Sequence, residues 1–149
     1  MCGLFGSPPV VDPQLGELRR SGRLWRGVLN LADVTVPLAL SGTRTEPDSA
    51  AIEIARSIPA SLPSWRPAIE RALFEHYEPY AGTEEDVPEI ADSAGVWPHV
   101  EARFVSVTPL SGQPVVEIGY EVAWDEEHTL GARFRDGQLL ELSGSVLAP

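Results

Sequence analysis

Alternation of apolar and polar side chains runs through the last third of the chain, and this feature restricts the fold most. A period of two residues is that of a β-strand with one buried and one solvated face. It predicts four strands, near residues 100–106, 116–122, 130–135 and 139–146. Residues 110–114 (LSGQP) and the Asp136-Gly137 dipeptide lie between these strands and are typical of β-hairpins. Strands joined by such tight turns pair antiparallel.

The first part of the chain predicts two further strands. Residues 24–29 and 34–40 are rich in apolar side chains, and residues 30–33 are the expected hairpin connection between them. Pro37 removes a backbone donor inside the second of these strands, so we expect that strand at a sheet edge or at a bulge. Earlier in the chain, Asp12 followed by proline is typical of a helix start and predicts a short helical turn over residues 12–18.

Two helices are expected in the middle of the chain. Residues 45–48 (TEPD) have the composition of a helix start, and apolar residues recur at helical spacing over residues 51–58. Pro59 and Pro63 are expected to end this first helix, and Ser64 to cap the second one. The second helix has an apolar face of residues four apart, namely Trp65, Ile69, Leu73 and Tyr77.

These elements predict an α+β fold in the order strand–strand–helix–helix–strand–strand–strand–strand (ββααββββ). The helix pair is expected to cover one face of an antiparallel sheet of about six strands. Residues 1–11 are expected to form a flexible leader, and residues 12–149 a single domain.

The charge of the chain excludes several kinds of partner. Its 149 residues include 11 arginines, no lysine and 22 acids, which give a net charge of −11 with neutral histidines. Phosphate backbones and anionic membrane surfaces require a basic face, so we expect neither nucleic acid nor a membrane as a partner. Cys2 is the single cysteine, which favours a reducing compartment. No signal peptide or membrane-spanning run is recognisable, and we predict a cytoplasmic protein.

Residues 81–95 form the first candidate site, because this segment carries five acids and neither arginine nor lysine. We interpret it as a solvated loop, with an attractive surface for a basic partner protein as the sharper hypothesis. Its acidic side chains are those of Glu84, Glu85, Asp86, Glu89 and Asp92.

The second candidate is the densest polar cluster of the chain, Trp124-Asp125-Glu126-Glu127-His128. Carboxylates together with an imidazole suit Mg²⁺, Mn²⁺ or Zn²⁺, and alternation along a strand end puts Glu126 and His128 on one face. The competing interpretation is a charged β-turn over a packed Trp124. A metal site also needs a ligand from elsewhere in the chain, and the sequence gives no reason to place His76 or His99 near the cluster.

Known catalytic motifs give little further guidance. The chain has no Gly-x-Ser-x-Gly, phosphate loop, dinucleotide fingerprint or paired-cysteine motif, so we predict no cofactor and no catalytic residue. Residues 1–6 (MCGLFG) resemble the start of class II glutamine amidotransferases, in which the cysteine is the nucleophile. That resemblance stops at Gly6, and Pro8 and Pro9 follow where that fold needs a strand. We therefore interpret Cys2 as incidental.

A second resemblance covers most of the chain, residues 12–147. It depends on residues 12–18 (DPQLGEL), 25–27 (WRG), 74–77 (FEHY), 124–131 (WDEEHTLG) and 134–137 (FRDG). In these patterns the chain resembles a group of small bacterial domains of unknown function, some of which look like immunity proteins of toxin systems. The resemblance implies a small cytoplasmic α+β protein with a protein partner, and it brings no catalytic residues.

Three functions compete at this point. The leading hypothesis is a non-enzymatic protein-interaction module, of the immunity type, that binds a basic partner. The alternative is a metal-dependent hydrolase that uses Asp125, Glu127 and His128. A third hypothesis is a small-molecule pocket between the helix pair and the sheet, with Trp65, Tyr77 and Tyr120 in its wall. The oligomeric state stays open.

Overall fold

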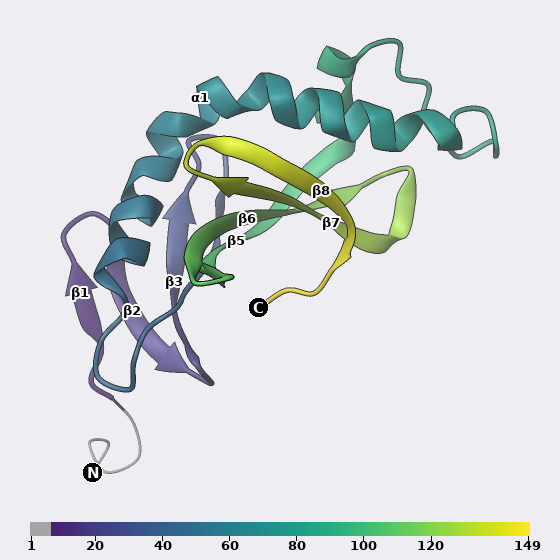
Figure 1. Ribbon diagram of the computed structural model, residues 1–149. Coiled ribbons are helices and arrows are strands. Elements are labelled where there is room, and N and C mark those ends of the chain that lie inside the picture. The colour runs from purple at the N-terminus through teal and green to yellow at the C-terminus, as the bar shows by residue number, and fades with distance from the viewer. Residues whose placement is uncertain (1–6) are drawn as a thin grey trace.

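Eight strands and one long helix make up the computed structural model, which describes residues 7–149 (Figure 1). Two short 3₁₀ helices, η2 (Glu78–Tyr80) and η3 (Ser93–His99), accompany the helix α1 (Ser49–Tyr77). The strands are β1 (Val10–Asp12), β2 (Gly16–Ser21), β3 (Leu24–Asn30), β4 (Thr35–Leu40), β5 (Val100–Leu110), β6 (Gln113–Val122), β7 (Asp125–Arg135) and β8 (Gln138–Val146).

The strands form one mixed sheet whose order is the order of the chain, from β1 to β8. All neighbours pair antiparallel except β4 and β5, which are parallel, with Leu38 opposite Val105 and Leu40 opposite Val107. The expected antiparallel sheet of about six strands with a helix pair is therefore wrong. The parallel pair exists because the long connection through α1 returns the chain to the same end of the sheet, as a crossover does.

A single bent helix replaces the two helices expected from the sequence. Pro59, Pro63 and Pro67 all lie inside α1, and Figure 1 shows the helix bending as it crosses the sheet. Each proline removes only one helical hydrogen bond, and Pro63 and Pro67 are exposed, so water can satisfy the carbonyls that lose a donor. Bending without breaking lets one helix follow a twisted sheet.

The expected helical turn over residues 12–18 is also wrong, because this segment is the hairpin of β1 and β2. The Asp12 carboxylate accepts hydrogen bonds from the N–H groups of Gln14 (3.0 Å) and Leu15 (2.8 Å). A carboxylate that caps a turn in this way makes the same bonds as one that starts a helix. Gly16, with a φ of 78°, then turns the chain back into β2.

Arg56 of α1 forms an ion pair with Asp12 and so ties the first hairpin to the helix. The pairing of β1 with β2 begins at Val10, within the segment expected as a leader. The prediction about Cys2 and the rest of residues 1–6 lies outside the described residues.

The two strands predicted before the crossover, over residues 24–29 and 34–40, are present as β3 and β4, with one difference from the expectation. β4 lies between β3 and β5 and is not an edge strand. Its proline is accommodated because the pairing with β5 begins only at Leu38, one residue after Pro37. In the C-terminal half all four predicted strands are present, and two of their turns contain residues with positive φ, at Ser111-Gly112 and at Asp136-Gly137.

The hydrophobic core lies between α1 and one face of the sheet. The buried face of α1 includes the predicted stripe of residues four apart, and Trp65 from this stripe stacks on Phe134 of β7, with ring centroids 4.3 Å apart. Trp25 of β3 is fully buried in the same core. In the part of the chain that the structure describes, no helix is both long enough and apolar enough to span a membrane.

Candidate functional site

The cluster of residues 124–128 lies at the tight turn between β6 and β7, with Trp124 in the connection and Asp125 to His128 at the start of β7. The structure divides the cluster into two groups. Trp124 and Asp125 are buried, whereas Glu126, Glu127 and His128 are exposed. The cluster is thus a charged turn over a packed tryptophan, and its buried carboxylate is its most unusual part.

Asp125 is the centre of a hydrogen-bonded network. Nδ1 of His128 lies 3.0 Å from both carboxylate oxygens, and the hydroxyl of Tyr80 donates to Oδ2 at 3.1 Å. The N–H of Glu127 donates to Oδ1 at 3.3 Å. Burial raises the pKa of Asp125, but the bonds from His128 and Tyr80 outweigh burial and leave that pKa below its ordinary value. The buried carboxylate is therefore ionised at neutral pH.

A second contact fixes the end of α1 to the same turn. The indole Nε1 of Trp124 donates to Nδ1 of His76 at 3.0 Å, and the His76 ring stacks on Tyr80. Burial lowers the pKa of His76, which keeps the imidazole neutral and its Nδ1 available as an acceptor. The edge of Trp124 also packs on Tyr77. These contacts join the β6–β7 turn to the end of the helix.

The sequence did not place His76 or His99 near the cluster, but the structure brings both beside it. His99 lines the same open groove as Asp125 and His128, and its carbonyl accepts from the N–H of Ala123 at 2.9 Å. One feature of the sequence indicates that His76 and Tyr80 lie close together at the end of the helix. His76 and Tyr80 are four residues apart, a spacing that puts them on one side of a continuing helix.

The groove beside the cluster has a volume of about 650 Å³ and is open to solvent. It lies where the start of β5, the end of β6 and the start of β7 meet. Arg103 of β5 pairs with Glu101 at 3.2 Å and with Glu121 at 2.7 Å, so two of the carboxylates at the groove are partly neutralised. The carboxylates that line it are those of Glu101, Glu121, Asp125, Glu126 and Glu127.

The groove lacks the arrangement that a metal ion needs. Across residues 7–149, no three or more histidine, cysteine, aspartate or glutamate side chains are grouped so that they could hold a metal. The ligands proposed from the sequence are spread instead, because Asp125 turns inward to Tyr80 while Glu127 is exposed. The arrangement can bind a cationic group through several carboxylates, and it offers an ionised Asp125 paired with His128.

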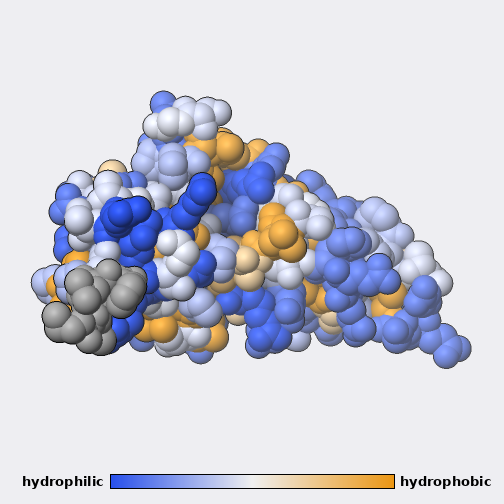
Figure 2. All heavy atoms as spheres, turned by 90° about the horizontal axis from the view of Figure 1, so that it is seen from below, coloured by the Kyte–Doolittle hydropathy of each residue, from blue (hydrophilic) through white to orange (hydrophobic). Residues whose placement is uncertain are grey.

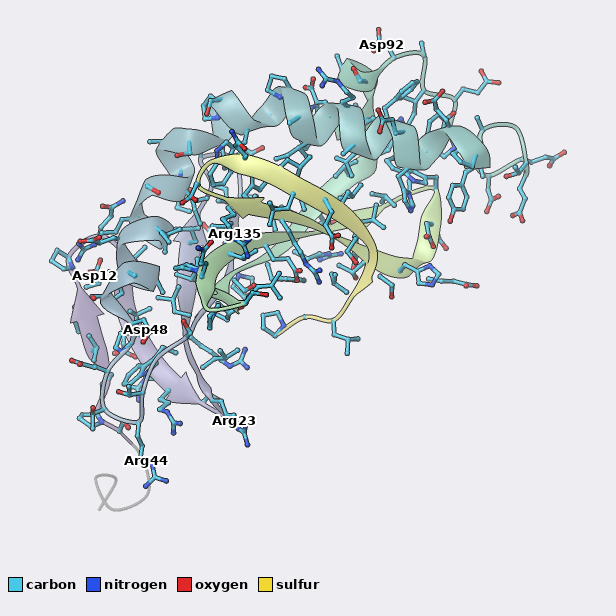
Figure 3. All side chains as sticks on the ribbon, viewed as in Figure 1. Asp12, Arg23, Arg44, Asp48, Asp92 and Arg135 are labelled. Atoms are coloured by element: carbon cyan, nitrogen blue, oxygen red, sulfur yellow. The ribbon has the colours of Figure 1, made fainter. Side chains whose placement is uncertain are left out.

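The acidic loop, residues 81–92, follows η2 at the same end of the molecule as the β6–β7 turn (Figure 1). The Tyr77 hydroxyl fixes its base, because it donates to the carbonyl of Pro88 at 2.7 Å and accepts from the N–H of Ile90 at 3.0 Å. Asp92, at the top of Figure 3, caps η3 through a bond from the N–H of Gly95. The five acids predicted as a partner-binding surface, Glu84, Glu85, Asp86, Glu89 and Asp92, are all exposed.

The three aromatic residues expected in one small-molecule pocket lie in different places. Trp65 stacks on Phe134 in the core, and Tyr77 contacts Trp124. Tyr120 lines a second cavity, between α1, β5 and the β3–β4 turn.

Comparison with known proteins gives a family but no function. The family model described as a domain of unknown function, DUF6985, matches residues 14–147, which is most of the chain. The chain belongs to this family. No curated protein and no solved structure matches it. The expectation of a small domain of unknown function is confirmed, while bacterial origin and the immunity-like resemblance stay predictions.

Proposed function

We propose that this domain is a non-enzymatic protein-interaction module whose partner is a basic protein. The partner docks on the acidic end, which we define as the acidic loop (residues 81–92) together with the groove beside the β6–β7 turn. The Tyr80 hydroxyl, at the start of the loop, bonds to Asp125 at the turn, so the two parts adjoin.

The observation that carries the proposal is the uneven distribution of charge. The first 63 residues contain six arginines and six acids, so the whole net charge of −11 comes from the remainder. Between Arg71 and Arg103 the chain has eight acids and no arginine. Arg23 and Arg44 lie at the opposite end of the molecule in Figure 3, and the tapering end in Figure 2 presents mainly hydrophilic side chains.

Negative charge concentrated at one end of the molecule favours binding of a positively charged surface. Like charges close together disfavour the compact state, and a basic partner relieves that repulsion while it is also attracted at long range. Complementary charge raises association rates and selects among partners. Nucleic acid is a poor candidate, because its phosphates carry the same sign as the acidic end.

The test compares two variants with the same net charge. In the first, Glu84, Glu85, Asp86 and Glu89 are changed to Gln or Asn; in the second, the exposed Glu17, Glu46, Glu53 and Glu141, away from the acidic end, are changed to Gln. A fluorescently labelled arginine-rich peptide is titrated into each protein, and binding is followed by anisotropy at several salt concentrations. We expect the first variant to lose about tenfold in affinity and the second less than about twofold. Equal losses would show that only the total charge matters and would contradict the proposal.

The narrower form of the proposal is an immunity-type role in which the basic partner is a toxin. Its support is the resemblance of residues 124–131 and 134–137 to small domains of that kind. The experiment mixes the purified domain with the product of a toxin gene adjacent to its own gene and measures toxin activity. Inhibition that is lost in the first variant supports this role, and undiminished toxin activity contradicts it.

A further inference from the structure

A second cavity, distinct from the acidic end, lies where α1 bends. It has a volume of about 420 Å³, and Pro59 and Pro63 of the helix form part of its wall. Leu31 and Val34, which flank the β3–β4 turn, and Ala102 of β5 contribute to the opposite side. Cavities of roughly 300–1,000 Å³ with apolar walls and a few polar groups are the usual form of small-molecule sites.

Tyr120 supplies this cavity with a hydroxyl group that makes no hydrogen bond within the described part of the protein. The chain has three tyrosines, and the hydroxyls of Tyr77 and Tyr80 each make the hydrogen bonds described above. Tyr120 is only 5% exposed and lines the cavity, and its hydroxyl makes no hydrogen bond to another group of residues 7–149. Within these residues the side-chain atoms that are both unpartnered and closed to solvent are Arg20 Nε and Arg135 Nε, so the Tyr120 hydroxyl is open to the cavity. A phenol hydroxyl that opens into a cavity is free to bond to water or to a ligand there. Burial raises the pKa of Tyr120, so the hydroxyl stays protonated and is a donor.

The charged groups around the cavity restrict what it can hold. The guanidinium of Arg66 already lies over the Trp97 ring, 4.2 Å from its centroid, and pairs with Glu70 at 3.4 Å. The Trp97 indole N–H also donates to Glu70, at 2.6 Å. Asp33 lines the cavity as well and would repel an anion. The one cation at the site is therefore engaged, and an anionic ligand has no free counter-charge among the lining residues.

We propose that this cavity binds a small uncharged molecule that has an apolar ring and an oxygen acceptor, such as a ketone or an ester. The ring fills the space between the prolines of α1 and Ala102, and the oxygen accepts a hydrogen bond from Tyr120. Trp97 packs edge-on against Tyr120, with centroids 6.2 Å apart, and so holds the phenol in place. The cavity is separate from the acidic end, so this proposal does not depend on the proposed function.

Acetophenone and ethylbenzene are suitable probes, because they share a ring and a two-carbon substituent and differ in the carbonyl oxygen. Each is titrated into ¹⁵N-labelled protein, and the indole N–H signal of Trp97 is followed by NMR. We expect both probes to shift this signal and acetophenone to bind more tightly. Tyr120→Phe, which removes only the unpartnered hydroxyl, should weaken acetophenone binding about three- to tenfold and leave ethylbenzene binding unchanged.

Two further variants make the result decisive. Tyr80→Phe also removes one tyrosine hydroxyl, but outside the cavity, and should leave the binding of both probes unchanged. Leu62→Trp places a larger side chain in the wall of the cavity and should abolish both. The proposal is overturned if neither probe shifts the Trp97 signal at millimolar concentration, or if Tyr120→Phe weakens both probes equally. It is also overturned if the shifts map to the β6–β7 turn.

Discussion

Replacing Gly119 by alanine tests how closely β5 and β6 pack on the face of the sheet away from α1. Phe104 of β5 lies opposite Gly119 of β6. Val105 and Val107 belong to the core under α1, so alternation points Phe104 to the other face, where it is nevertheless buried. Its ring lies over Gly119. A β-carbon on residue 119 would lie 2.5 Å from Cδ2 and Cζ of that ring, and closer still to Cε2.

The size of the effect follows from this overlap. Ordinary carbon contacts are about 3.5–4.0 Å, so the ring must move by about 1 Å or more within a packed environment. Such overpacking lowers the free energy of unfolding by about 1–3 kcal/mol, whereas replacing glycine in a strand by itself raises it by about 0.5–1 kcal/mol. We expect Gly119→Ala to lower the free energy of unfolding by about 1–2 kcal/mol. With a urea m-value of about 2 kcal/mol per molar, the midpoint falls by about 0.5–1 M.

The assay is urea unfolding of four proteins: wild type, Gly119→Ala, Phe104→Leu and the double variant. Leucine lacks Cε2 and Cζ, two of the three ring atoms nearest the new β-carbon, and its δ-methyl groups are free to rotate away, so in the Phe104→Leu background Gly119→Ala should cost less than about 0.5 kcal/mol. A coupling free energy of about 1–2 kcal/mol between the two sites is expected. Additive effects of the two substitutions, with unchanged m-values, would refute the reasoning.

Three other predictions concern the contacts around α1 and the groove. Tyr77→Phe leaves the carbonyl of Pro88 and the buried N–H of Ile90 without their partner; it should cost about 1–3 kcal/mol and speed amide exchange at residue 90, measured by NMR. The hydrogen bond from Arg56 lowers the pKa of Asp12 to about 2 from an ordinary 3.8. Ionised Asp12 therefore stabilises the folded state, fully above about pH 4 and less and less as the pH falls towards 2. Urea midpoints should show Asp12→Asn less stable than wild type at about pH 7 and equal to it near pH 2. A difference between the two proteins that does not change with pH would contradict this. Millimolar Zn²⁺ or Mn²⁺ should leave the melting temperature within about 1 °C, because residues 7–149 hold no group of three or more metal ligands.

The C-terminal half of the sheet could be predicted because its signals are local. Alternation fixes which face of each strand is buried, and Asp136-Gly137 has the positive φ angles, 50° and 76°, that a two-residue hairpin turn requires. The helix is mispredicted for the opposite reason. Proline is a local signal for a break, but the course of α1 is set by the core residues that hold it on the sheet, such as Ile58 and Ile69, on either side of Pro63.

The candidate site could be predicted only in part. Asp125 and His128 are three residues apart, so a short sequence motif can indicate that they pair. His76 and Tyr80 lie within the crossover, at the end of α1 and in η2, some 45 residues before the cluster, and no pattern in a single sequence predicts that contact. Tyr120 was expected in a pocket, but the lack of a partner for its hydroxyl depends on what surrounds it in three dimensions. Contacts of this kind are decided by packing and not by local residue preference.

The match between strand order and chain order has a consequence for synthesis. During translation β1 to β4 emerge together and can pair before β5 exists, because within the described residues only the β4–β5 pair joins distant segments. Until β5 arrives, β4 is an unprotected edge to which other nascent chains can add. Pro37 makes that temporary edge a poor template for foreign strands. A proline in the middle of the finished sheet can thus protect the chain while it is still incomplete.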